Sequence, residues 1–457
     1  MPTRADVVIC GAGIAGIATA YYLTVHHGIR DVVLIENERP MTLTSAKPIE
    51  GYRNWWPGPG DAMVRFMNRS IDLLEGLATD TNNLIGLSRR GYLFATTDAS
   101  RRSEFQQVAA EFSALGVGDV REHLGNGTTT PYTYTPDAPI SQQPGGVDVI
   151  ANRALIEQHF GYLPAATRVL LHARRCGWFG ANRTGMYLLE QAQQHGATLL
   201  RGTVAGVQVE QGRVAGVHLV QDETPHTIKT ATFVNAAGPY VQDVGRMLGV
   251  ELPVYTEPHF KIAFRDPAGI IPRHAPLIIW MDTIRLHWTD AERAQLAAAH
   301  DTRWLLDDLP AEMHWRPGNE PQSVIVAWTY RTAPMRATFP LTIEPRYPEL
   351  VMRAMTSVFP DLAQYIATTP ALEYDGGYYT RTQENRPLVG PLPIDGAYVI
   401  GALSGFGLMG CVGLGELITA HITGGALPPY AAAFDLRRYA APDYQRLLTN
   451  WHATWQL

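Results

Sequence analysis

The 457-residue sequence is poor in lysine and cysteine and has no surplus of positive charge, and each shortage excludes a class of protein. Its net charge of −6 and its pI near 6.2 argue against binding to nucleic acid or to an anionic membrane. The three cysteines, Cys10, Cys176 and Cys411, lie far apart in no metal-ligand spacing. We therefore expect small buried cysteines in a reducing compartment, and neither a disulfide framework nor a metal site.

Long uninterrupted apolar runs are also missing. The most apolar stretch, residues 399–427, is broken by many glycines and by Glu416, so we expect no membrane span. The N-terminus has no basic segment before a plain apolar run, which argues against a secretion signal. We therefore expect a cytoplasmic protein, and the length predicts two or three domains.

A glycine motif stands at the start of the chain. "DVVIC" (6–10) and "DVVLIE" (31–36) predict buried strands, and residues 17–27 predict a helix between them. Gly11, Gly13 and Gly16 form G-x-G-x-x-G after the first strand, and Glu36 ends the second. This spacing is typical of dinucleotide binding: the glycines admit the pyrophosphate at a helix N-terminus, and the acid accepts from ribose hydroxyls.

The rest of the chain indicates one domain interrupted by another. We predict helices at 61–77 (with Asp61 as N-cap), 101–115 and 185–195, strands at 91–96 and within 196–220, and an irregular segment at 125–147. Small-residue patterns return at "FVNAAG" (233–238) and at 398–425, whereas residues 252–370 are mixed and rich in aromatics. The predicted fold class is α/β: a discontinuous Rossmann-like dinucleotide-binding domain (1–90, 151–253, 371–457) and a second, mixed-sheet domain (91–150, 254–370).

The sequence resembles the FAD-dependent D-amino-acid-oxidase superfamily, the group with glycine oxidase, sarcosine oxidase and dimethylglycine dehydrogenase. The resemblance covers most of the chain and rests on "VVICGAGIAGIATAYYL", Glu36, "TSA", "GTVAGVQVEQGRVAGV", "FVNAAG", "TRTQENRPLVGPLP" and "YVIGALSGFGLMGCVGLGELIT". It implies that the first of these domains is an FAD-binding domain and the second a substrate domain. It also implies that the strand at Thr203–Val204 contacts adenine and that a glycine-rich helix points its N-terminus at the flavin. The residues that it assigns to FAD, together with the glycine motif, are Gly11, Gly13, Ile14, Ala15, Gly16, Glu36, Asn37, Thr44, Ser45, Ala46, Lys47, Val204, Ala236, Ala237, Gly238, Gly405, Phe406, Gly407, Leu408 and Met409.

The resemblance also interprets the unusual loop "TSAKPIEGYRNWWPGPG" (44–60), which carries more aromatic and charged side chains than most loops. In relatives this loop runs beneath the flavin, and the residues after it wall the substrate cavity. We therefore expect Tyr52 and Arg53 near the flavin ring. Packing between the domains is the alternative for Trp55 and Trp56.

Several positions depart from the superfamily pattern. The loop has Ala46 and Lys47 where some relatives carry a flavin-linked histidine, and Gly377 stands where others carry a linking cysteine, so we expect non-covalent FAD. Tyr379 occupies the usual place of a carboxylate-binding arginine, with Arg381 two residues on, and Glu384 replaces an aspartate.

The usual carboxylate-binding arginine is therefore missing or relocated. We consider Arg53, Lys261, Arg285 and Arg331 as candidates, since arginine can grip a carboxylate with two parallel hydrogen bonds. His259 is a candidate cavity residue or a structural histidine. Arg174 and Arg175 are expected to face either the cavity, or solvent or a partner. The candidate catalytic residues are Tyr52, Arg53, His259, Lys261 and Tyr379.

The resemblance implies oxidation of the C–N bond of a small amine or amino acid, secondary or N-methylated, by hydride transfer to flavin N5, giving an imine that hydrolyses. Two alternatives stay open. A hydroxy-acid dehydrogenase would need a base such as His259 or His287 over the ring. A flavin-binding subunit of a hetero-complex would need an exposed apolar patch or a partner. The expected partner is a small-molecule substrate, and the sequence leaves the electron acceptor and the oligomeric state open.

Overall fold

The fold follows from a computed structural model that describes residues 1–47, 49–125, 131–368 and 372–451. Its strands are β1 Val7–Cys10, β2 Val32–Glu36, β3 Gly51–Arg53, β4 Tyr92–Thr96, β5 Val120–His123, β6 Val147–Ile150, β7 Val169–Ala173, β8 Cys176–Trp178, β9 Ala197–Arg201, β10 Thr203–Glu210, β11 Arg213–Gln221, β12 Thr224–Lys229, β13 Phe233–Asn235, β14 Tyr255–Arg265, β15 Leu277–Trp280, β16 Met313–Pro317, β17 Ser323–Ala327, β18 Glu373–Arg381, β19 Leu388–Pro391 and β20 Ala397–Gly401. Its α-helices are α1 Ile14–Tyr21, α2 Ala62–Asp80, α3 Arg102–Ala114, α4 Arg153–Phe160, α5 Ala181–Gln194, α6 Val241–Met247, α7 Asp290–Ala298, α8 Tyr347–Val358, α9 Ala363–Thr368, α10 Gly407–Thr423 and α11 Pro442–Thr449.

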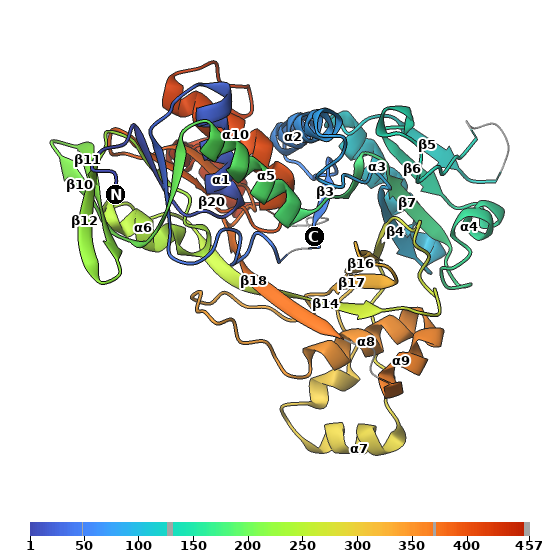
Figure 1. Cartoon of the computed structure of the whole chain (residues 1–457). Coiled ribbons are helices and arrows are strands. Elements are labelled where there is room, and N and C mark those ends of the chain that lie inside the picture. The colour runs from blue at the N-terminus through green and yellow to red at the C-terminus, as the bar shows by residue number, and fades with distance from the viewer. Residues whose placement is uncertain (48, 126–130, 369–371, 452–457) are drawn as a thin grey trace.

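The first large sheet has the strand order β19-β20-β13-β1-β2-β9, and its strands come from distant parts of the chain. They are parallel except for β19, which pairs antiparallel with β20. The core strands are buried along their length, as expected for a parallel sheet covered on both faces. The predicted discontinuous α/β architecture is therefore confirmed (Figure 1).

The second large sheet has nine strands in the order β18-β14-β17-β16-β15-β4-β7-β6-β5. It includes β7 and β18, which lie inside segments that the sequence analysis gave to the FAD-binding domain. Both strands pair in this sheet, β7 with β4 and β6, and β18 with β14. The predicted boundaries at 150 and 370 are thus displaced. The local sequence of a strand does not show which distant strand it pairs with, so it could not show to which sheet β7 and β18 belong.

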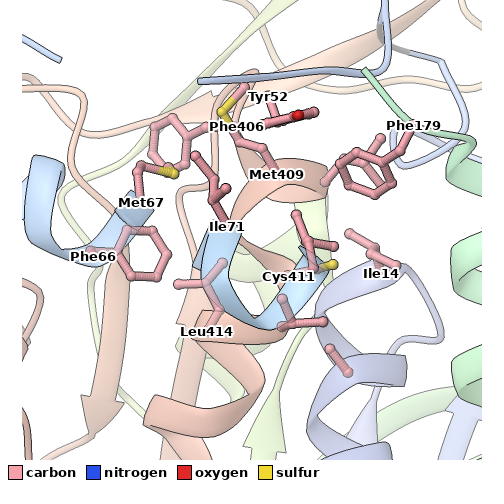
Figure 2. Close-up of a cluster of buried hydrophobic side chains, with 14 of the residues drawn as sticks. Ile14, Tyr52, Phe66, Met67, Ile71, Phe179, Phe406, Met409, Cys411 and Leu414 are labelled. Carbon is pink, nitrogen blue, oxygen red and sulfur yellow. The ribbon is translucent and has the colours of Figure 1, made fainter. Parts of the chain in front are cut away.

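The glycine-rich helix α10 packs closely against α1 and α2. A Cβ atom at Gly413 would lie 3.0 Å from the ring of Phe66, and one at Gly415 would lie 2.8 Å from the carbonyl oxygen of Ala18. Figure 2 shows Phe66, Ile71, Cys411 and Leu414 in the buried cluster that results. Small residues on α10 therefore let three helices approach, and they fix where its N-terminus points.

The local predictions hold with shifted ends. The predicted helix at 17–27 begins earlier, at Ile14, and ends as a π-helical turn over Tyr22–His26. Asp61 precedes α2 as expected, but its side chain pairs with Arg65 at 2.6 Å instead of capping the helix. All three cysteines are free and buried. No helix in the described part of the chain is long and apolar enough to cross a membrane.

Candidate active site

Three spaces that share lining residues run through the molecule from the glycine motif to the nine-stranded sheet. The nucleotide cleft, about 300 Å³, lies at the carboxyl ends of β1, β2 and β13. A connecting passage of about 80 Å³ follows it beside the N-terminus of α1. The inner cavity, about 570 Å³, lies between the N-terminus of α10 and the face of the nine-stranded sheet. The passage shares Thr44 and Ser45 with the cleft, and Tyr379 and Gly405 with the inner cavity.

Most of the predicted cofactor residues line these spaces. The cleft contains Gly11, Gly13, Glu36, Asn37, Thr44, Ser45, Val204, Ala236, Ala237 and Gly238. The passage adds Ile14, Ala15, Gly405, Gly407 and Leu408. Phe406, Met409 and Lys47 lie at the inner cavity instead. Gly16 and Ala46 line none of the three. Gly16 serves packing, since a Cβ there would lie 2.0 Å from the carbonyl oxygen of Gly11.

The cleft is built for a close approach of backbone to ligand. Gly11 has φ +104°, and a Cβ there would lie 2.6 Å from the carbonyl oxygen of Ala236. Glu36 accepts from the backbone N–H of Ala12 at 2.8 Å, so its carboxylate is held over the glycine turn. The N-terminus of α1 adds its partial positive charge, which attracts a phosphate. This donor set fits the pyrophosphate and ribose of FAD.

The loop after β2 ties the two halves together. Ser45 Oγ accepts from the N–H of Ile14 at 2.9 Å, and Thr44 Oγ1 donates to the carbonyl oxygen of Tyr378 at 3.0 Å. Gly377 lets the loop cross β18, because a Cβ there would lie 3.1 Å from Thr44 Cα. Lys47 Nζ then pairs with Asp375 at 2.7 Å. The lysine therefore lies at the cavity wall and not against the nucleotide.

The second part of the loop is held from the opposite side. Arg316 on β16 donates to the carbonyl oxygen of Ile49 and to the Glu50 carboxylate, each at 2.6 Å, and Glu50 also accepts from the N–H of Ala181 at 2.9 Å. The next three residues form β3, in which alternate side chains face opposite ways. Gly51 and Arg53 consequently line the inner cavity.

Tyr52 is placed differently from our expectation. It lies between the two cavity-lining residues on β3, so its side chain points into the core, where its ring packs 6.1 Å from Phe179 (Figure 2). Trp55 is likewise buried, against Phe94 and Phe112. Trp56 does line the cavity, beneath the guanidinium of Arg53 at 4.4 Å. The aromatic loop thus supplies one wall residue and two core residues.

The opposite wall comes from the pairing of β14 with β18. Glu257, His259 and Lys261 project from one face of β14, opposite Tyr379, Gly377 and Asp375 on β18. The rings of His259 and Tyr379 stack with centroids 3.9 Å apart and planes at 15°. The sequence prediction had placed His259, Lys261 and Tyr379 at the site, and the structure brings all three together with Arg53 around one cavity.

Both ring nitrogens of His259 are engaged. Nε2 lies 3.1 Å from the carboxylate of Glu257, which can only accept, and Nδ1 lies 2.9 Å from the hydroxyl of Thr329. Burial lowers the pKa of His259. Burial would raise the pKa of Glu257, but hydrogen bonds from His259 and Arg381 outweigh it and hold that pKa at about 2. His259 is therefore a neutral ring that supports Tyr379, with no nitrogen left for the substrate.

The cationic candidates separate clearly. Arg53 is 3% exposed and lines the cavity, as does Lys261, and burial lowers the pKa of both side chains. Arg285 is exposed and pairs with Asp308 at 2.9 Å, and Arg331 is exposed and lies over Trp304. Neither lines the cavity, so both are wrong as anchors.

Arg174 and Arg175 do not face the inner cavity either. The first pairs with Asp148 and the second with Asp72 and Glu75. Both arginines form ion pairs within the chain, so neither is explained by solvent or a partner alone.

The cavity also contains polar residues that sequence reasoning missed. They are Arg101, Glu257, Glu312, His314 and Thr329. In "EMHW", Glu312 and His314 alternate with apolar residues, so a strand with one polar face was a usable signal. The others carry no local signature, because they become neighbours only through the nine-stranded sheet.

Comparisons with known proteins agree with this geometry. Residues 6–421 match the family model described as FAD dependent oxidoreductase. Human mitochondrial sarcosine dehydrogenase is 28% identical over 59% of this chain, and the match spans only 26% of that protein, so the chain covers about a quarter of its length. Sarcosine oxidase subunit beta of Rhodobacter capsulatus is 23% identical over 95% of this chain and 89% of its own length. The crystal structure of L-proline dehydrogenase from P. horikoshii has a similar fold, with a TM-score of 0.71, 19% identity and coverage of 96% of this chain and 99% of that chain.

Proposed function

The chain belongs to the FAD dependent oxidoreductase family, and on that premise we propose that it oxidises the C–N bond of a small amino acid or amine, giving an imine that water hydrolyses. A secondary or N-methylated amine is the proposed substrate class. The names of the similar proteins, sarcosine dehydrogenase and sarcosine oxidase subunit beta, support this choice. FAD, when bound, supplies the redox chemistry by accepting a hydride at N5.

One observation carries the proposal: the inner cavity continues the connecting passage and has a wall that bears cations. Gly405 and Phe406 at the N-terminus of α10 form one side, and Arg53 and Lys261 lie among the facing residues. The helix N-terminus stabilises negative charge at that side. A buried arginine grips a carboxylate with parallel hydrogen bonds. The cavity therefore suits a small carboxylate beside a flavin ring.

The remaining wall residues orient the substrate and exclude water. Trp56, Phe406 and Met409 are nearly fully buried and close one side with apolar surface. Tyr379 presents a phenol whose pKa burial raises to about 12, so it stays a hydrogen-bond donor over the working pH range. Its place on β18, where relatives carry a carboxylate-binding arginine, supports a role as a second carboxylate contact.

We further propose that FAD is held without a covalent bond. Ala46 and Lys47 occupy the loop position of a linking histidine, and Gly377 occupies that of a linking cysteine. Acid precipitation of the yellow protein is expected to leave the flavin in the supernatant. Colour that stays with the precipitated chain would contradict this.

The alternative of a hydroxy-acid dehydrogenase has little support. The two histidines considered as its base do not suit that role, because both nitrogens of His259 are engaged and His287 is exposed. The alternative of a hetero-complex subunit is favoured by one observation, the end-to-end likeness to a protein named sarcosine oxidase subunit beta. Its test is the mass of the purified native protein and the identity of any partner that elutes with it.

The direct test is an anaerobic titration of the purified protein with amines, N-methyl amino acids, amino acids and hydroxy acids. Loss of the visible flavin band with an amino acid or amine, and not with the matching hydroxy acid, is the expected result. Recovery of the band in air would define an oxidase, and its absence would define a dehydrogenase with another acceptor. Reduction by hydroxy acids alone would overturn the proposal.

A further inference from the structure

We propose that Glu312 receives the ammonium group of a zwitterionic substrate and removes its proton, while Arg53 holds the carboxylate. This inference rests on the proposed amino-acid oxidation and names the residue that makes the amine reactive. A hydride leaves the α-carbon readily only when the nitrogen carries a free electron pair. Amino acids are mostly zwitterions at neutral pH, so the protein needs a proton acceptor at this point.

The backbone of Glu312 is held in one place just before β16. Its N–H donates to the carbonyl oxygen of Trp280 at 2.7 Å, and its own carbonyl accepts from His314 Nδ1 at 3.0 Å. Its φ of +69° lies in the left-handed region. Its side chain lines the inner cavity.

The carboxylate of Glu312 is available to a ligand. Among the described residues no hydrogen bond to this carboxylate is found, although its backbone is bonded on both sides. Burial raises its pKa, and the charges of Arg53 and Arg101 oppose that rise. The titratable groups that share the cavity with it are Arg53 from β3, Tyr92 from β4, Arg101 beside α3, Glu257, His259 and Lys261 from β14, His314 from β16, Tyr379 and Arg381 from β18, and Lys47 from the loop.

Arg53 and Glu312 together complement a zwitterion. The two side chains come from different halves of the molecule, and each contributes to the electrostatic field at the other. A zwitterionic α-amino acid carries its ammonium and its carboxylate on the same α-carbon. A cation and an anion that line the same cavity can therefore bind the carboxylate and the ammonium group of one substrate molecule.

Two other titratable groups of the cavity, Glu257 and His314, are less suitable bases. Glu257 is committed to His259 and Arg381, and its pKa of about 2 makes it a weak acceptor. His314 donates to a backbone carbonyl, and burial lowers its pKa to about 4. In the proposed step one proton passes from the substrate nitrogen to a Glu312 oxygen, which leaves a neutral amine and a neutral carboxyl. The proton returns to solvent after the imine has left.

The test is the pH dependence of kcat/KM for the amino acid that reduces the wild type, compared with Glu312→Gln. The wild type can bind the abundant zwitterion, so kcat/KM is expected to be flat between the pKa of Glu312 and that of the substrate ammonium. The variant must use the rare neutral amine. Its kcat/KM should fall about 100-fold at neutral pH and rise about tenfold per pH unit toward the wild-type value.

The matched control is Glu104→Gln, which removes a carboxylate that pairs with Arg101 behind the cavity wall. It should keep the flat region. An equal loss at every pH in Glu312→Gln, or an unchanged profile, would overturn the role of Glu312. An intact FAD spectrum and an unchanged Tm confirm that the variant is folded. A wild type that no amino acid reduces would overturn the proposed function itself, so the two failures are distinguishable.

Discussion

The nucleotide cleft and the inner cavity are made of different kinds of group. The cleft is lined by four glycines and several other small residues, and Gly11 packs against Ala236 so tightly that a Cβ would lie 2.6 Å from a carbonyl oxygen. The inner cavity is lined by charged and aromatic side chains from β3, β14, β16 and β18. Backbone recognition needs a fixed local spacing, whereas side-chain recognition needs strands to be brought together. Backbone recognition in the cleft therefore tolerates little change in shape, whereas side-chain recognition in the inner cavity can be altered by substituting single residues.

The largest effect is expected in the cleft, from Gly11→Ala. The new Cβ would overlap the carbonyl of Ala236 in a residue whose φ is +104°. We expect a cost of about 2–4 kcal/mol and nearly complete loss of FAD from the purified protein. The flavin-to-protein ratio after gel filtration measures it. The matched control is Gly28→Ala, which also has a positive φ, +68°, but meets nothing within 4 Å. Equal FAD content in the two variants would contradict the account.

The next largest effect is expected at the inner cavity, from Arg53→Met. This variant should keep FAD but lose kcat/KM for an amino acid by about 100-fold, since a desolvated charge contact with the substrate is worth about 2–5 kcal/mol. Anaerobic stopped-flow reduction, with the flavin content measured in parallel, checks it. Arg285→Met is the matched control, because that arginine is exposed and paired with Asp308. A loss of FAD in Arg53→Met, or an equal loss of rate in both variants, would be against the assignment.

A smaller effect concerns stability at acid pH. We expect a buried histidine in the nine-stranded sheet to lower the free energy of unfolding as the pH falls. His172 on β7 is 1% exposed, and burial lowers its pKa to about 3. The folded state therefore disfavours the protonated ring, so stability is full above the unfolded pKa of about 6.5 and falls as the pH drops toward the folded pKa. The loss from pH 7 to pH 5 should be about 2 kcal/mol.

Urea unfolding at the two pH values measures this loss, and His172→Gln should reduce it. The control is His195→Gln, which replaces an exposed histidine at the end of α5. The same pH dependence in wild type and His172→Gln would contradict the prediction. A reduced dependence in His195→Gln alone would place the acid-sensitive histidine in the other half of the molecule.

The smallest effect is expected from Tyr379→Phe. The ring can still stack on His259 at 3.9 Å, so only the hydroxyl donor is lost. We expect a decrease in kcat/KM of about tenfold, equivalent to about 1.4 kcal/mol. Steady-state kinetics check it against Tyr378→Phe, whose hydroxyl lies 3.3 Å from Thr338 on the other face of the strand. A larger effect at Tyr378 would show that the wrong face of β18 had been assigned to the site.

The same contrast explains what could be predicted from the sequence. The glycine motif, Glu36 and "FVNAAG" lie within short stretches, so their spacing alone predicted the cleft and the parallel sheet around it. Arg53, His259, Lys261 and Tyr379 line one cavity in the structure, and their catalytic roles stay a prediction. Tyr52 was misplaced because one residue of register on β3 turns a side chain from cavity to core.

Other features were out of reach for a physical reason. The strands β7 and β18 join the nine-stranded sheet through partners far away in the chain, which no local pattern reports. Arg285 and Arg331 were as plausible as Arg53 by residue type alone, and only their exposure separates them.

The most direct test of the central claim, that an anion anchor and the flavin share one cavity, uses a small carboxylic acid without an amino group, such as benzoate. It cannot be oxidised at a C–N bond, so any change that it causes in the visible spectrum of bound FAD reports binding beside the ring. If Arg53 is the anion anchor, we expect a saturable spectral shift in the wild type and in Arg285→Met, and none in Arg53→Met. A wild-type spectrum that does not respond, or a shift that persists in Arg53→Met, would contradict it.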